Sequence, residues 1–210
     1  MPAALRVYRS ERRPAAALIL APGAGAGQDS PFMTDAATAL ASRGLVVATF
    51  DFPYRTAGRK APDPGRVLEA HWRASIEAAT GESSFEALPL FIGGKSMGGR
   101  IASQVAAAGD LPIAGLVFLG YPLHPPGKPS QRRDRHLPSI HRRMLFVQGT
   151  RDPFGTAAEI RELIPRLDDR TRLLDIEGGD HSFKVPARSG RTYAGVLTGI
   201  FDAVVAWITA

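Results

Sequence analysis

Residues 88–100 read Leu-Pro-Leu-Phe-Ile-Gly-Gly-Lys-Ser-Met-Gly-Gly-Arg, an apolar run followed by a glycine-rich turn. The continuous apolar run predicts a buried strand over residues 88–92, and apolar residues at helical spacing from Met97 to Val105 predict a helix behind the turn. Glycines two residues before and after Ser96 leave room for a sharp change of direction. The stretch therefore predicts a strand, a tight turn and a helix, with Ser96 at the tip of the turn.

A serine in this position is placed to react. Its hydroxyl is exposed above the edge of the sheet, at a helix N-terminus where backbone N–H groups and the helix dipole favour negative charge. The pattern Gly-x-Ser-x-Gly between a strand and a helix is typical of a nucleophile elbow. A plain glycine-rich turn is the alternative, because the five-residue pattern alone is weak. The surrounding strand and helix favour a nucleophilic Ser96.

The composition narrows the class of protein. With 210 residues, 44% of them hydrophobic, we expect a single domain over residues 1–210 with a substantial core. The chain has no cysteine, which excludes disulfides, thiolate zinc sites and a cysteine nucleophile. Residues 12–26 superficially resemble a secretion signal, but their apolar part is short and we expect a core strand there. Since no apolar run approaches the ~20 residues of a membrane span, we expect a cytoplasmic protein.

The formal net charge is +6, and much of the excess lies in residues 128–143. Nucleic-acid binding is therefore one candidate. That segment lacks the aromatic residues on which single strands stack, and the chain has no recognisable nucleic-acid-binding motif. A solvated basic surface loop is the favoured interpretation, whose field could bias the protein toward anionic substrates. The sequence does not indicate an oligomeric state.

Apolar runs and amphipathic segments alternate along the chain. We expect strands over residues 15–21, 45–50, 88–92, 113–119, 144–148 and 172–176, with a short edge strand near residues 5–10. We expect helices over residues 31–42, with Ser30 as N-cap, and over residues 66–79, 156–164 and 193–208, besides the one after Ser96. This succession predicts an α/β fold with a doubly wound, mostly parallel sheet, helices on both faces and no lid domain.

A serine hydroxyl needs a general base, and the base needs an acid to orient it. Asp152 follows the expected strand 144–148, and His181 follows the expected strand 172–176. The carboxyl ends of parallel strands meet at one edge of a sheet, so Ser96, Asp152 and His181 are predicted to converge, in the chain order of a Ser–Asp–His triad. Asp152 as a mere helix cap and Asp180 as a rival acid remain the alternatives.

The oxyanion of acyl transfer needs two backbone donors. The N–H of Met97, directly after the serine, is one candidate. Ala24, in the glycine-rich loop after the first core strand, is the other, since Pro22 has no N–H. A phosphate-binding loop is the alternative there, but the spacing of neither common glycine motif is present.

Four residues near strand ends are predicted to line the substrate pocket: Gly25, Tyr54, Tyr121 and His124. Proline-stiffened turns are the alternative role for the segments that carry the last three. Lys95 and Arg100 flank the serine turn. Arg100 is expected to be a solvent contact on its helix, and a clamp for a ligand is the alternative.

Several segments together resemble a family of small, lidless α/β-hydrolases related to dienelactone hydrolases. They are Pro22-Gly-Ala-Gly-Ala-Gly-Gln-Asp-Ser-Pro-Phe-Met33, Asp51-Phe-Pro-Tyr54, Gly93-Gly-Lys-Ser-Met-Gly-Gly-Arg100, Gly120-Tyr-Pro-Leu-His-Pro-Pro-Gly-Lys128, Gly149-Thr-Arg-Asp152 and Gly179-Asp-His-Ser182. The resemblance implies the α/β-hydrolase fold, a triad on Ser96, Asp152 and His181, and no cofactor. The family's oxyanion loop usually begins His-Gly, whereas this one begins Pro22-Gly23.

These observations predict a serine hydrolase that cleaves a small ester or related acyl substrate through an acyl-enzyme intermediate, with no metal and no cofactor. The alternative is a non-catalytic scaffold or binding protein with a hydrolase fold, since some members of the resembled family are similar to scaffold subunits. The sequence does not distinguish ester, thioester and amide substrates.

Overall fold

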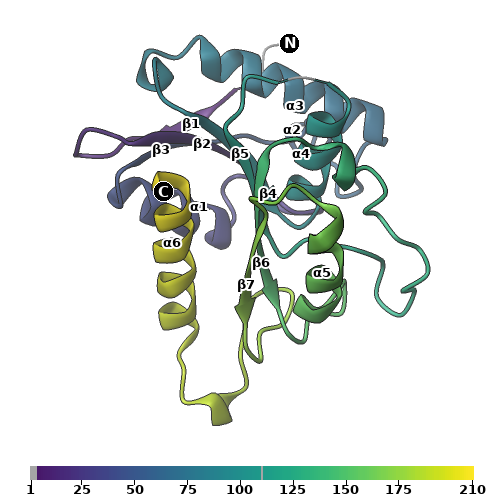
Figure 1. The fold of residues 1–210 in the computed structure, drawn as a ribbon. Coiled ribbons are helices and arrows are strands. Elements are labelled where there is room, and N and C mark those ends of the chain that lie inside the picture. The colour runs from purple at the N-terminus through teal and green to yellow at the C-terminus, as the bar shows by residue number, and fades with distance from the viewer. Residues whose placement is uncertain (1–3, 110) are drawn as a thin grey trace.

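The computed structural model describes residues 4–109 and 111–210, which form a seven-stranded sheet with helices on both faces (Figure 1). The strand order is β1-β3-β2-β4-β5-β6-β7. The strands are β1 (Arg6–Tyr8), β2 (Ala16–Ala21), β3 (Leu45–Thr49), β4 (Leu90–Lys95), β5 (Gly115–Leu119), β6 (Arg143–Gly149) and β7 (Arg172–Ile176). Strand β1 pairs antiparallel with β3 at the edge, and the other neighbouring pairs are parallel.

The helices are α1 (Pro31–Ser42), α2 (Pro53–Thr56), α3 (Gly65–Thr80), α4 (Met97–Ala107), α5 (Ala157–Leu163) and α6 (Tyr193–Thr209). Helices α1 and α6 cover one face of the sheet, and α3, α4 and α5 cover the other (Figure 1). Each face has its own apolar core. Because both faces are covered, a central strand such as β2 is buried along its whole length and is apolar throughout, as its sequence predicts.

The prediction of a doubly wound α/β-hydrolase fold is confirmed, and the bounds of the predicted helices and strands differ by a few residues at most. The largest shift is in β4, which continues through two glycines to Lys95. A Cβ on Gly93 would lie 1.9 Å from the carbonyl oxygen of Val117 in β5, so glycine lets the two strands stay paired there. The single-turn helix α2 was not predicted, and Ser30 precedes α1 without a side-chain capping bond.

Strands β4, β6 and β7 are parallel, so their carboxyl ends lie at one edge of the sheet. The irregular chain between β5 and β6 runs beside this edge and holds one short 3-10 turn, Leu137–Ser139. Within the described part of the chain, no inserted lid domain covers the edge, and no helix is both long and apolar enough to cross a membrane.

Candidate active site

Ser96 lies at the turn between β4 and α4 in a strained backbone conformation, with φ 50° and ψ −115°. Glycine on either side makes this turn possible. A Cβ on Gly94 or on Gly98 would lie 2.3 Å from the carbonyl oxygen of Ala21 in β2. Side chains at these two positions would therefore force the elbow away from the sheet.

Asp152 follows the end of β6 and is 1% exposed. Its Oδ2 accepts a hydrogen bond from Gln148 Nε2 at 2.9 Å, and its Oδ1 accepts one from the backbone N–H of Phe154 at 2.8 Å. These bonds fix the carboxylate and leave Oδ2 aimed at the imidazole of His181, whose Nδ1 lies 2.7 Å away.

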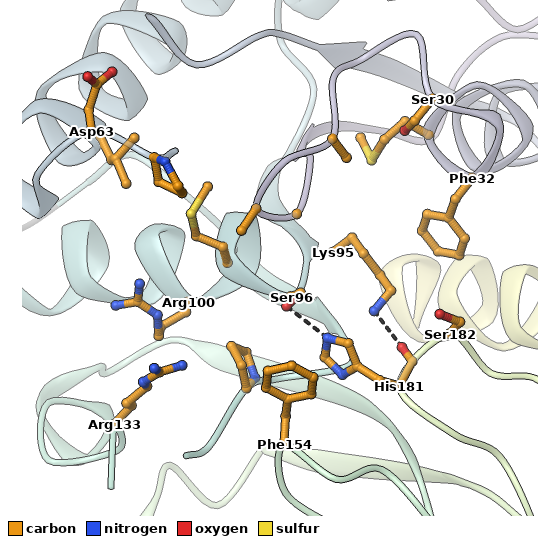
Figure 2. A pocket seen from close by; sticks show the side chains of 18 of the residues that line it. Ser30, Phe32, Asp63, Lys95, Ser96, Arg100, Arg133, Phe154, His181 and Ser182 are labelled. Carbon is orange, nitrogen blue, oxygen red and sulfur yellow. Dashed lines mark hydrogen bonds between the residues drawn. The ribbon is translucent and has the colours of Figure 1, made fainter. Parts of the chain in front are cut away.

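His181 follows β7 and connects the acid to the serine. Its Nε2 lies 2.9 Å from Ser96 Oγ (Figure 2). Because a carboxylate only accepts hydrogen bonds, the Nδ1 bond to Asp152 assigns the proton to Nδ1. Nε2 is then free to accept the hydrogen of the Ser96 hydroxyl. The ring of Phe154 lies against the imidazole, with 4.3 Å between the ring centroids.

The rival acid, Asp180, has another role. Its Oδ1 accepts hydrogen bonds from the backbone N–H groups of Ser182 and Lys184, at 2.8 and 2.9 Å. It therefore closes the turn that carries His181, while Asp152 contacts the imidazole.

Met97 and Ala24, whose backbone N–H groups are the predicted oxyanion donors, both line the cavity beside Ser96. Within residues 4–109 and 111–210, neither N–H group donates a hydrogen bond. The loop with Ala24 is anchored on both sides of it. A Cβ on Gly23 would lie 3.6 Å from Ser96 Cβ, and the N–H of Gly25 donates to Tyr54 Oη at 3.0 Å. This arrangement leaves the Ala24 donor unused beside the serine.

Ser96 and His181 open into a cavity of about 600 Å³ that extends to both sides of the serine (Figure 2). Its walls are largely apolar. They include Phe32, Met33, Leu68, Pro122, Phe154 and Tyr193. Cavities of this size and character hold small organic molecules.

The prediction that Gly25, Tyr54, Tyr121 and His124 line this cavity is wrong, because none of them is among its lining residues. Tyr54 is fully buried under the loop whose Gly25 it binds. Tyr121 is 1% exposed, and its hydroxyl donates to the carbonyl oxygen of Arg133. These side chains point into the protein and hold the strand-end loops.

His124 also turns away from the cavity. Its imidazole is buried against α5, with Nε2 3.0 Å from Glu159 Oε1 and Nδ1 2.9 Å from the carbonyl oxygen of Pro125. Its neighbour Pro122 lines the cavity instead. The segment from Tyr121 to His124 thus lies beside the cavity as predicted, but Pro122 lines it in place of Tyr121 and His124.

Lys95 is a site residue that the sequence analysis missed. Its Nζ donates to the carbonyl oxygen of His181 at 2.6 Å (Figure 2) and lies 5.3 Å from the centre of the Phe183 ring. Burial lowers the pKa of Lys95 to about 8, although the charges of Asp152 and Asp180 oppose this change. A lysine directly before the serine at a strand end was the available signal.

Arg100 also differs from its prediction, since it is half-buried and lines the cavity rather than facing solvent. From the basic segment, Arg133 lines the cavity as well. Arg143 is used in the fold: its guanidinium donates to the carbonyl oxygens of Trp207 and Ile208, at the end of α6. The basic segment is thus partly structural and partly directed at the site.

Within the described chain, no three His, Asp or Glu side chains gather as metal ligands would.

Residues 14–209 match the family model described as alpha/beta hydrolase domain. Dienelactone hydrolase from Anabaena variabilis is a similar solved structure, with a TM-score of 0.73 and 21% identity over 97% of this chain and 89% of that one. A serine hydrolase without lid from Xanthomonas campestris gives a TM-score of 0.70 and 20% identity, over 98% of this chain and 89% of that one.

Est1E from Butyrivibrio proteoclasticus, solved with ferulic acid bound, gives a TM-score of 0.75 at 12% identity, over 99% of this chain and 96% of that one. At these identities the solved structures support the shared fold. The family model covers nearly the whole chain, and the protein belongs to the alpha/beta hydrolase domain family.

Proposed function

We propose that this protein is a serine hydrolase that cleaves a small ester or related acyl substrate. The observation that carries the proposal is the continuous hydrogen-bonded series from Asp152 Oδ2 through the His181 imidazole to Ser96 Oγ, at 2.7 and 2.9 Å. A serine hydroxyl becomes a useful nucleophile when a positioned base takes its proton. The series supplies that base and the group that orients it.

In the first step, Ser96 Oγ attacks the acyl carbon while His181 Nε2 takes the hydroxyl proton. Asp152 holds the imidazole in the required tautomer and stabilises the imidazolium that forms. The negative charge on the carbonyl oxygen is stabilised by the N–H groups of Met97 and Ala24, which are preorganised and unused before reaction.

In the second step, the imidazolium gives its proton to the leaving oxygen, and the bond to the leaving group breaks. A water molecule then attacks the acyl-enzyme with His181 again as base, which releases the acid and restores Ser96. The largely apolar cavity on both sides of Ser96 is suited to an acyl chain and an alcohol of moderate size.

The test is hydrolysis of p-nitrophenyl butyrate by the purified protein and by Ser96→Ala. We expect the substitution to lower kcat by on the order of 10⁴-fold or more, because it removes the nucleophile on which the other two residues act. Ser139→Ala, at an exposed serine of the chain between β5 and β6, is the control and should keep full activity. Equal turnover by Ser96→Ala would refute the proposal.

A non-catalytic scaffold is the alternative function. It predicts no Ser96-dependent turnover of any ester or thioester in a graded panel.

A further inference from the structure

Two arginine side chains line the cavity on the same side of Ser96. Arg100 projects from α4 and Arg133 from the chain between β5 and β6, and Figure 2 shows their guanidinium groups next to each other. Like charges in a partly desolvated site repel each other. Burial, together with the charge of Arg133, lowers the pKa of Arg100. This arrangement needs a negative partner to be favourable.

Among the described residues, no carboxylate forms an ion pair with either arginine, although the charge of Glu69 acts on Arg100 from farther away and raises its pKa. Arg100 donates from Nη1 to Gln104 Oε1 at 3.1 Å, while its Nε is buried without a hydrogen-bond acceptor. Arg133 forms no side-chain hydrogen bond or ion pair with the described residues. Asp63 also lines the cavity, but its Oδ1 is paired with Arg59 at 2.7 Å and its Oδ2 is buried without a hydrogen bond to either arginine.

The residues on either side of Arg133, Arg132 and Asp134, form ion pairs, whereas Arg133 does not. Arg132 Nη2 lies 2.8 Å from Asp134 Oδ2, and Arg132 Nη1 lies 4.0 Å from Glu159 Oε1. Asp134, which directly follows Arg133 in the sequence, thus pairs with Arg132 instead. The fold keeps Arg133 directed at the cavity and without a partner.

The backbone of Arg133 is fixed at both of its polar groups. Its N–H donates to the carbonyl oxygen of Leu123 at 2.8 Å, and its carbonyl oxygen accepts from Tyr121 Oη at 2.9 Å. Nearby, His136 Nε2 lies 2.8 Å from Ser103 Oγ on α4. These contacts tie the Arg133 segment to the helix that carries Arg100, so the two guanidinium groups are presented together.

Their position relates them to the reacting bond. Arg100 is one helical turn after Ser96, and its N–H donates to the carbonyl oxygen of Ser96 at 3.1 Å. Four residues of α-helix rise about 6 Å, so the backbone of Arg100 begins about that far along the helix from Ser96, and both side chains line the same cavity.

We propose that Arg100 and Arg133 form an anion-binding subsite that selects esters bearing a carboxylate a few bonds from the scissile carbonyl. Guanidinium groups bind carboxylates through paired, charge-assisted hydrogen bonds, which fits two adjacent arginines that lack acidic partners. This inference rests on the proposed hydrolase function and specifies its substrate class. The carboxylate could belong to the acyl part or to the leaving alcohol, and the test separates the two sources.

The experiment compares kcat/KM for matched pairs of substrates. Mono-p-nitrophenyl glutarate against p-nitrophenyl valerate places the charge on the acyl part, and para-acetoxybenzoate against para-acetoxybenzamide places it on the leaving group. We expect the protein to prefer the charged member of one pair by roughly tenfold or more, the usual worth of a hydrogen bond to a charged group. Arg133→Gln and Arg100→Gln should each remove most of that preference.

Arg135→Gln is the matched control, because Arg135 lies two residues from Arg133 and is exposed. It should leave the preference unchanged, which separates a local subsite from the general effect of net positive charge. Equal rates within both pairs, or a preference that survives Arg133→Gln, would overturn the proposal.

A binding measurement keeps the subsite distinct from the catalytic proposal. Glutarate is titrated calorimetrically into Ser96→Ala and into Ser96→Ala with Arg133→Gln. Weakening of binding by roughly tenfold in the second protein supports the subsite even where no ester is hydrolysed. If glutarate does not bind to Ser96→Ala while the wild-type protein hydrolyses neutral esters, the subsite proposal is overturned and the hydrolase proposal stands.

Discussion

The cavity has a lysine on one side of Ser96 and two arginines on the other (Figure 2). The cationic groups on the two sides differ in the partners that the protein gives them. On the lysine side, Lys95 Nζ donates to the carbonyl oxygen of His181 and lies near the rings of Phe32 and Phe183. On the arginine side, Arg100 and Arg133 form no ion pair with the residues that the structure describes. A partly buried cation with protein partners supports the site, whereas one without them is available to a ligand.

The difference assigns separate tasks to the two sides. The lysine side holds the loop that carries the proposed base, so its changes should alter the rate of chemistry for every substrate. The arginine side should alter the choice between substrates.

The largest effect is expected for Lys95→Met, which removes the charge-assisted bond to the His181 carbonyl. Bonds of this kind contribute about 1.5–3 kcal/mol, so kcat for p-nitrophenyl butyrate should fall by roughly 10- to 100-fold. Lys95 is a positioning residue, and KM should change much less than kcat. Steady-state kinetics of Lys95→Met and of Lys184→Met, a change at an exposed lysine near His181, provides the measurement and its control. Similar kcat values for the two variants would contradict this role.

The second effect concerns stability and pH. The pKa of Lys95 is lowered from 10.5 to about 8 in the folded protein, so the unfolded chain binds more protons between these values. The free energy of unfolding should therefore rise with pH across this interval, by about 3 kcal/mol at most, because solvent moderates the shift of a half-buried group.

Lys95→Met provides the comparison for this rise. Urea unfolding of the wild type and of Lys95→Met at several pH values from 8 to 10.5 isolates the contribution of this residue, since other ionising groups are common to both. The wild type should gain stability relative to the variant as the pH rises. Parallel curves would show that the Lys95 ammonium is not desolvated as the structure indicates.

The smallest effect is expected on the arginine side. Tyr121→Phe removes the hydroxyl that binds the Arg133 carbonyl oxygen, which should loosen that segment and lower the preference for carboxylate-bearing esters by about threefold. Tyr54→Phe is the matched control, because Tyr54 is equally buried but its hydroxyl holds the loop with Ala24. It should slow charged and neutral esters alike. If Tyr54→Phe changed the preference and Tyr121→Phe did not, the assignment of the two sides would be reversed.

The sequence predicted most of what backbone topology determines. Continuous apolar runs mark buried parallel strands, and residues that follow such strands must lie at the same edge of the sheet. This reasoning placed Ser96, Asp152 and His181 within reach of one another although they are far apart in the chain.

Side-chain direction in the strand-end loops was not predictable in the same way. Tyr121 and His124 follow a strand that ends at the site, yet their side chains turn inward to hydrogen-bond partners distant in the sequence, the Arg133 carbonyl and Glu159. Arg100 was expected in solvent because helical periodicity alone does not show that the Arg133 segment packs beside it. Such pairings depend on long-range packing rather than on local pattern.

The central claim, that Ser96 is an activated nucleophile, is tested most directly with a fluorophosphonate probe. Intact-protein mass spectrometry followed by peptide mapping should find one covalent adduct, on Ser96, that is absent from Ser96→Ala and forms much more slowly in Asp152→Asn. An unmodified wild-type protein, or an adduct on another serine, would contradict the account.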